Sequence, residues 1–363
     1  MHLDDAAELR RRYTGESRCG AKAELRRLPA GDPLIPRSSG DQEFLEAEVL
    51  RGLLEYPSTY TTRPFRVLWV IPRPTGMTIR FAADADADGL TDFVAWGLFP
   101  AGGEDDMRGI PGLRLVNAGH NRMDVGLLGT RARIRLEGVP STSWREVEAV
   151  RQRAAGDAGE TAPFRHPELT LSEKAFTQRH SWLVEARRGT AALGSALLRR
   201  LGLFRTAADW HDMAGYTKYS DTFAFRMTFT KEMLTSHAEF LRQLTQPDCG
   251  IPIVQRMAAC SCATGGTDCR LYLTCQPPYE GRVELQFATS WECSASEIAE
   301  VLRYAGSPES DIARYVPLRP GLACRHDRAI HGRTLQFLQG LAGSRRAQRA
   351  EAAPTDSAGM GTK

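Results

Sequence analysis

The clearest alternation of apolar and polar positions lies in residues 253–288. Two alternating segments, 253–263 and 268–275, flank the dipeptide Gly265-Gly266, and glycine tolerates the positive φ that a two-residue hairpin turn needs. Residues 282–288 alternate in the same way after a turn. Because successive side chains of a strand point to opposite faces, this region predicts three antiparallel strands with one apolar and one polar face.

A helix is expected to cover the apolar face of these strands. Ser294 and Glu297 have capping-box spacing, and apolar residues follow at helical intervals as far as Gly306. Residues 65–98 show the same order, with two alternating segments, a turn rich in proline and glycine, and an amphipathic segment. Duplication of a strand–strand–helix unit is one interpretation, and chance likeness between two hairpins is the other.

The chain therefore predicts an α+β protein. Its antiparallel sheet would be built from strand–strand–helix units with apolar faces covered by helices, and the sheet would be either open or closed into a barrel. We expect an N-terminal helical and loop segment at 1–60, a first half at 61–156, a helical connection at 157–215, a second half at 216–342 and a disordered tail at 343–363.

Arginines recur on the polar sides of the expected strands. The candidates for substrate binding are Arg66, Arg80, Arg226, Arg270 and Arg282. Guanidinium groups suit phosphate or carboxylate, so a closed sheet would enclose a basic cavity, whereas an open sheet would expose the arginines to solvent. In architecture alone, the closed form resembles the barrels of aromatic prenyltransferases, which repeat a strand–strand–helix unit around a ligand. The helical middle at 170–203 departs from that repeat.

Four further residues are candidates for proton transfer. Tyr272 and Glu284 fall on the same polar face as the arginines. His326 and His331 lie beside a cysteine and an aspartate near the C-terminus, and imidazole is the side chain best suited to exchange protons near neutral pH. These four residues are the predicted catalytic set.

Composition and charge narrow the class of protein. The 363 residues include 47 basic and 44 acidic side chains, and the net charge of +3 gives no clear sign of nucleic-acid binding. The charged N-terminus has no apolar core and no run of 18 apolar residues exists, so we expect neither a secretory signal nor a membrane span. The eight cysteines are irregularly spaced, which favours a cytoplasmic location.

Two motifs raise the question of metal binding. Residues 84–89 resemble the start of a calcium loop, but Ala95 occupies the twelfth position, and an acidic helix N-terminus is the alternative. The expected hairpin places Cys262 opposite Cys269, on the same face as Cys260. These thiols could approach one ion or pack as small apolar groups, and the second interpretation is preferred. No metal site and no cofactor are predicted.

Common catalytic signatures are missing from the sequence. It contains no P-loop, no dinucleotide-binding glycine fingerprint behind a strand, no G-x-S-x-G and no H-E-x-x-H. The leading hypothesis is a cytosolic biosynthetic enzyme of the group-transfer class, which binds an anionic small-molecule substrate on the arginine-bearing sheet face. The alternative is a non-catalytic interaction or assembly protein whose partner is another protein.

Overall fold

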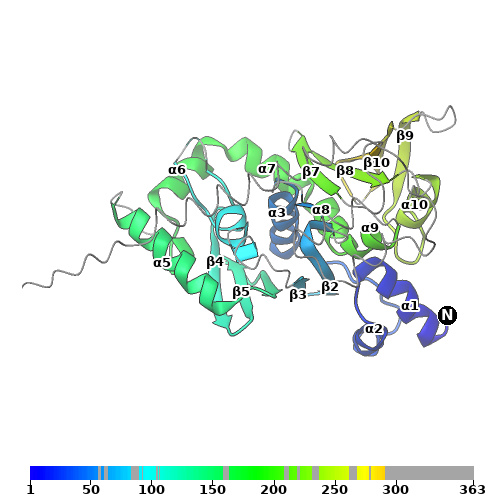
Figure 1. Ribbon diagram of the computed structural model, residues 1–363, viewed down its shortest axis with the longest axis horizontal. Helices are drawn as coiled ribbons and strands as arrows, with labels where there is room; N and C mark the ends of the chain where they lie inside the picture. Colours follow the sequence, from blue (N-terminus) through cyan, green and yellow to red (C-terminus); the bar gives the residue numbers. More distant parts are fainter. Residues whose placement is uncertain are drawn as a thin grey trace, which may run out of the picture.

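Two β-sheets and several helices form a mixed α+β protein (Figure 1). The structure is a computed structural model of the chain. It describes residues 1–55, 59–60, 64–82, 90–91, 93–103, 105, 107–157, 163–207, 212–218, 221–230, 237–260, 268–277 and 279–290.

The first sheet has five strands in the order β2-β3-β6-β5-β4. Its strands are β2 (Val67–Arg73), β3 (Gly76–Phe81), β4 (Leu113–Gly119), β5 (Arg122–Leu127) and β6 (Arg133–Glu137). All neighbours are antiparallel except β3 and β6, which are parallel. Alternate residues, among them Ile79, Val125 and Ile134, are fully buried, so one face of the sheet lies against the core.

The second sheet has six strands in the order β1-β7-β8-β11-β10-β9. They are β1 (Thr59–Tyr60), β7 (Asp212–Lys218), β8 (Thr222–Thr230), β9 (Ile253–Cys260), β10 (Asp268–Cys275) and β11 (Arg282–Ser290). Here β8 and β11 form the parallel pair. The apolar face carries Phe223, Phe225 and Leu285, each at most 1% exposed.

Both sheets share one strand order. A hairpin, β2–β3 or β7–β8, is followed by an antiparallel meander, β4–β5–β6 or β9–β10–β11. The last strand of each meander then joins the second strand of its hairpin in parallel. The hairpin and the meander are connected through η2 (Phe93–Leu98) in the first sheet and α10 (His237–Leu244) in the second. The strands from β2 to β6 of the first sheet are therefore equivalent, in the same order, to the strands from β7 to β11 of the second.

Helix α3 (Asp41–Glu55) lies between the two sheets and contacts strands of both (Figure 1). Twelve of its 15 residues are buried, which is the expected condition of a helix covered on all sides. Its main helical neighbour is α8 (Ala191–Leu198), which together with α9 (Leu201–Ala207) continues the core under the second sheet. The interior is thus continuous from one sheet to the other.

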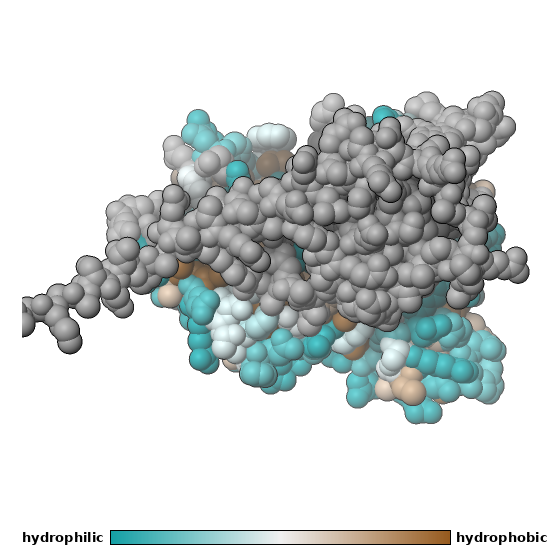
Figure 2. Space-filling view, in the orientation of Figure 1, coloured by the Kyte–Doolittle hydropathy of each residue, from teal (hydrophilic) through white to brown (hydrophobic). Residues whose placement is uncertain are grey.

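The remaining helices lie around this core. They are α1 (Leu3–Thr14), α2 (Arg18–Leu25), α5 (Ser141–Asp157), α6 (Leu171–Arg179) and α7 (Ser181–Gly189), with short helical turns η1 (Pro64–Arg66) and η3 (Pro163–Arg165). Helix α1 contacts α2, α9 and β2. Figure 2 shows that the surface over α1 and α2, at the lower right, is mostly hydrophilic.

Several arginines are part of the interior and hold elements together. Arg199, which follows α8, donates two hydrogen bonds of 2.7 and 2.6 Å to the carboxylate of Glu46 on α3. Arg114 on β4 likewise donates two hydrogen bonds, of 2.9 and 2.8 Å, to the two carboxylate oxygens of Glu173 on α6. Buried charges are tolerated when they are paired and hydrogen-bonded, as these are.

Several predictions about the sheet require correction. The expected single sheet, open or closed into a barrel, is two sheets, and no closed barrel forms among the described residues. The duplication of residues 65–98 at 269–302 is not confirmed. β2–β3 form one edge of their sheet, whereas β10–β11 lie within theirs, and residues beyond 290 fall outside the described part of the chain.

The predicted register of the β9–β10 hairpin is also wrong. Cys269 lies opposite Cys260 rather than Cys262, and residues 261–267 fall outside the described part of the chain. A register shift at Tyr272 and Leu273 moves the pairing by one further residue. Turn chemistry alone identified the hairpin but not the register of its strands.

Candidate functional site

The polar face of the second sheet brings two of the predicted substrate-binding arginines into one row. Gln286 on β11 pairs with Arg226 on β8 and with Arg270 on β10. Neighbouring strands lie about 4.8 Å apart, so the backbones of the two arginines are about 10 Å apart with the glutamine between them. We call Arg226, Gln286 and Arg270 the second-sheet row.

Both arginines of the second-sheet row are available to a ligand. Arg226 and Arg270 are exposed, and Gln286 is half-buried. Neither arginine makes a hydrogen bond or an ion pair within the described part of the chain. A guanidinium group carries five N–H donors in a planar fork and stays protonated at any physiological pH. Among the described residues, the row therefore carries two arginines without an acidic partner and an uncharged amide.

The next row on the same face contains the two predicted catalytic residues of this sheet. Glu284 pairs with Tyr272 on one side and with Ala224 on the other. Glu284 is only 5% exposed, and it has no hydrogen-bond or ion-pair partner among the described residues. The sequence had placed both residues on the arginine face, and the register agrees.

Apolar residues on the opposite face hold these rows in place. Between the two polar rows, Leu285 on β11 pairs with Phe225 on β8 and with Leu271 on β10. Each of these three side chains is at most 1% exposed. The ring of Phe225 stacks on Phe204 of α9 with 4.6 Å between centroids. Because strands have a side-chain period of two, burial of these residues turns the polar rows away from the core.

The first sheet has a corresponding row with a different central residue. Glu137 on β6 pairs with Arg80 on β3 and with Arg122 on β5, which are the equivalent strands. We call these three residues the first-sheet row. Arg80 forms an ion pair of 3.6 Å with the Glu137 carboxylate. One row away, Arg135 donates a 2.7 Å hydrogen bond to Asp124, which raises the pKa of the arginine. Acidic side chains thus pair with Arg80 and Arg135 on this face.

The other predicted arginines lie apart from the second-sheet row. Arg80 is on the first sheet, and Arg66 precedes β2 in a left-handed conformation, with φ at 61°. Arg282 is on the second sheet but pairs with Asp221 at 3.5 Å. It lines a cavity of about 510 Å³ that also contains Glu185 and Glu280. Three carboxylates around one guanidinium make that cavity unsuited to an anion.

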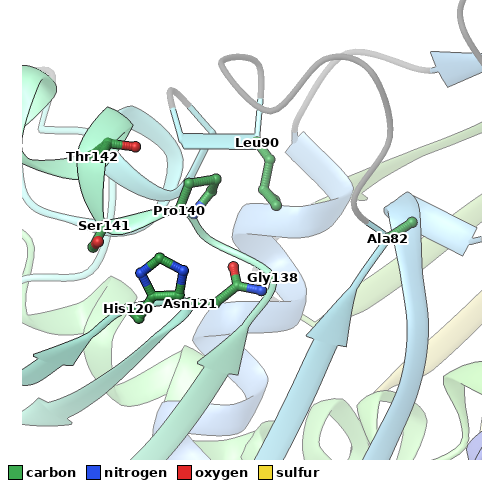
Figure 3. A pocket seen from close by; sticks show the side chains of 8 residues that line it. All are labelled: Ala82, Leu90, His120, Asn121, Gly138, Pro140, Ser141 and Thr142. Carbon is green, nitrogen blue, oxygen red and sulfur yellow. The ribbon is translucent and has the colours of Figure 1, made fainter.

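A second cavity, of about 280 Å³, lies at the end of the first sheet (Figure 3). His120, from the β4–β5 turn, lies beside Pro140 and Ser141 at the start of α5. The Ser141 amide donates a 3.0 Å hydrogen bond to the His120 carbonyl, which joins the turn to the helix. None of the residues predicted for the site lines this cavity.

The remaining chemical candidates are only partly within the described residues. His326, His331, Cys262 and residues 84–89 lie outside them. Cys269 is buried, and burial raises the pKa values of Cys249 and Cys275 to about 12. No group of three potential metal ligands occurs among the residues that the structure describes.

Sequence reasoning missed one residue of the second-sheet row. Gln286 belongs to the alternating segment 282–288, but its place between two arginines depends on its cross-strand neighbours. A neutral residue between arginines from two other strands is invisible until the pairing is known.

Comparisons with known proteins give no relative. No protein-family model, no curated protein and no solved structure matches the chain. Among the described residues, no helix combines the length and the apolar composition that a membrane crossing requires.

Proposed function

We propose that the protein binds an anionic small molecule, carrying phosphate or carboxylate, on the polar face of the second sheet. The observation that carries the proposal is the second-sheet row, in which two exposed arginines flank a neutral glutamine and have no acidic partner among the described residues. Hydrogen bonds between guanidinium and oxyanion are charge-assisted and are about twice as strong as neutral ones.

Group transfer in biosynthesis is the reaction that this arrangement supports best. The arginines would hold the anionic part of the substrate, and the adjacent Glu284 would accept the proton of an attacking hydroxyl or amine. The leaving group would depart with its negative charge facing the guanidinium groups. Tyr272, the cross-strand neighbour of Glu284, would donate a hydrogen bond to a reacting oxygen. General base catalysis of this kind contributes about 10²–10⁴-fold to a rate.

A non-catalytic interaction protein is the second candidate, and the open form of the sheet favours it. The strands that the structure describes form two separate sheets and no closed barrel, which leaves the row on a face rather than inside a ring of strands. A face of this kind could meet an acidic segment of another protein. Such a partner would need the arginines but not Glu284, which separates the two candidates.

Calorimetric titration with pyrophosphate tests the proposal. The double variant Arg226→Ala/Arg270→Ala should lose binding by about 100-fold or more, since a hydrogen bond to a charged group contributes about 1.5–3 kcal/mol. Arg122→Ala is the matched control, because it removes an exposed arginine from the equivalent strand of the first sheet. Absence of binding to the unmodified protein, or equal loss in the control, would contradict the proposal.

Glu284→Gln distinguishes the enzyme from the interaction protein. The substitution keeps the shape of the side chain and removes its capacity to accept a proton at neutral pH. For an enzyme, turnover of a phosphorylated substrate should fall at least about 100-fold while pyrophosphate binding is retained. Unchanged turnover would remove Glu284 from the catalytic set.

A further inference from the structure

The first-sheet row and the second-sheet row differ chiefly in the residue at their centre. Both rows place arginines on the two strands that flank the last strand of the meander. The central residue is Glu137 in one sheet and Gln286 in the other. The side chains differ by one functional group, a carboxylate that carries a negative charge against an amide that carries none.

Glu137 acts within its row as a built-in anion. Its carboxylate lies 3.6 Å from Arg80 and so occupies the position that an external oxyanion would take. On the other side of Glu137, the side chain of Arg122 crosses Gly119 on β4, since a Cβ on that glycine would lie 3.2 Å from Arg122 Cγ. Gln286 offers the same length of side chain without the charge, and its amide can donate hydrogen bonds to a ligand.

We infer that Gln286 is the residue that makes the second-sheet row a site for phosphate-type oxyanions, and that Glu137 closes the equivalent site on the first sheet. This inference rests on the proposed function of the second-sheet row. With Gln286 at the centre, the row consists of two arginines and an amide in register on β8, β11 and β10, and it contains no acidic residue.

The width of the row selects phosphate over carboxylate. A carboxylate has two oxygens in one plane, and a single guanidinium fork satisfies it. The arginine backbones are about 10 Å apart, so two forks approach the ligand from opposite sides. A tetrahedral phosphate or a pyrophosphate has oxygens facing both forks and a further oxygen for the amide. Glu284, in the next row, adds one negative charge beside the site and disfavours additional anionic groups in that direction.

The test is calorimetric titration of the full chain with pyrophosphate and, separately, with succinate. Gln286→Glu should weaken pyrophosphate binding at least about tenfold, because it introduces a charge within about 5 Å of both arginines. Gln286→Met, which is neutral and of similar size, should retain binding within about tenfold and controls for packing. Succinate should bind at least about tenfold more weakly than pyrophosphate.

The reciprocal variant tests the same claim on the other sheet. Glu137→Gln should add a second, weaker pyrophosphate site, which Arg80→Ala in the same chain should remove. The inference is overturned if Gln286→Glu binds as the unmodified protein does, if succinate binds as tightly as pyrophosphate, or if Glu137→Gln still has one site. In each of these cases, loss of binding in Arg226→Ala/Arg270→Ala leaves the proposed function standing. Absence of any binding to the unmodified protein overturns both.

Discussion

The two sheets have the same strand order but treat their arginines differently. On the first sheet, Arg80 pairs with Glu137 and Arg135 pairs with Asp124. On the second, Arg226 and Arg270 flank Gln286 and have no partner among the described residues. An arginine on a strand is therefore not evidence of a binding site by itself. The acidic residues that the fold brings near it decide whether it is paired.

Buried arginines form a third group, beside the paired and the unpaired arginines of the sheet faces. Arg199 is 1% exposed and donates hydrogen bonds to both carboxylate oxygens of Glu46. Burial is the main cause that lowers the pKa of Arg200 to about 10. These side chains join α3, α8 and the loops around them. The comparison thus separates arginines that hold the fold, arginines neutralised on a surface and arginines left open to a ligand.

The largest effect on stability is expected from breaking an interior pair. Glu46→Gln should lower the free energy of unfolding by about 3–5 kcal/mol, because it leaves the buried Arg199 without its charge partner. Urea denaturation at neutral pH measures the change. A loss below about 1 kcal/mol would show that this arginine is no more structural than those of the sheet faces.

A smaller effect on stability is expected from Glu173, the acidic member of the Arg114–Glu173 pair. Burial raises the pKa of Glu173, but hydrogen bonds from Arg114, Gly112 and Thr170 outweigh burial and lower the pKa below its ordinary value of 4.5. Stability from this pair is therefore complete above about pH 4.5 and is lost as the pH falls through the folded-state pKa.

Glu173→Gln should remove that pH dependence. At pH 7 the variant should lose about 2–3 kcal/mol, the contribution of hydrogen bonds to a charged group. Below the folded-state pKa its stability should approach that of the unmodified protein. Acid unfolding followed by circular dichroism measures the stability of both proteins at pH 7 and below the folded-state pKa. Parallel curves for the two proteins would show that Glu173 does not contribute to acid sensitivity.

The smallest effects are expected on the two sheet faces, where the comparison is sharpest. Arg135→Ala should cost about 0.2–1 kcal/mol, as is typical of a partly exposed ion pair. Arg226→Ala should change stability by less than about 0.5 kcal/mol, because the side chain has no partner to lose among the described residues. Thermal unfolding of the two variants side by side provides the measurement. A greater loss for Arg226→Ala would mean that this arginine supports the fold.

The sequence predicted the faces of the strands better than their arrangement. Alternation correctly placed the apolar residues of 282–288, such as Leu285, in the core and Glu284 with Tyr272 on the polar face. It could not show that β8 joins β11 in parallel, because these strands are separated by the whole β9–β10 hairpin. β7 was missed altogether, since Asp212–Lys218 has no clean alternation.

The sequence predicted only part of the candidate site, because alternation does not show which strands pair. Five arginines were grouped because a single sheet was assumed, and the two-sheet structure keeps only Arg226 and Arg270 in one row. Arg282 was expected to be open to an anion, but Asp221, one residue before β8, pairs with it. Long-range pairing decides which charges meet, and a periodic pattern contains no information about it.

A crystal structure of the protein with tungstate, a heavy tetrahedral oxyanion, tests the central claim most directly. Its anomalous signal locates the bound ion without reference to the rest of the map. The account predicts a peak between the guanidinium groups of Arg226 and Arg270, within hydrogen-bonding distance of the Gln286 amide, and no peak at the first-sheet row. A peak at Arg80 and Arg122, or none on the second sheet, would contradict it.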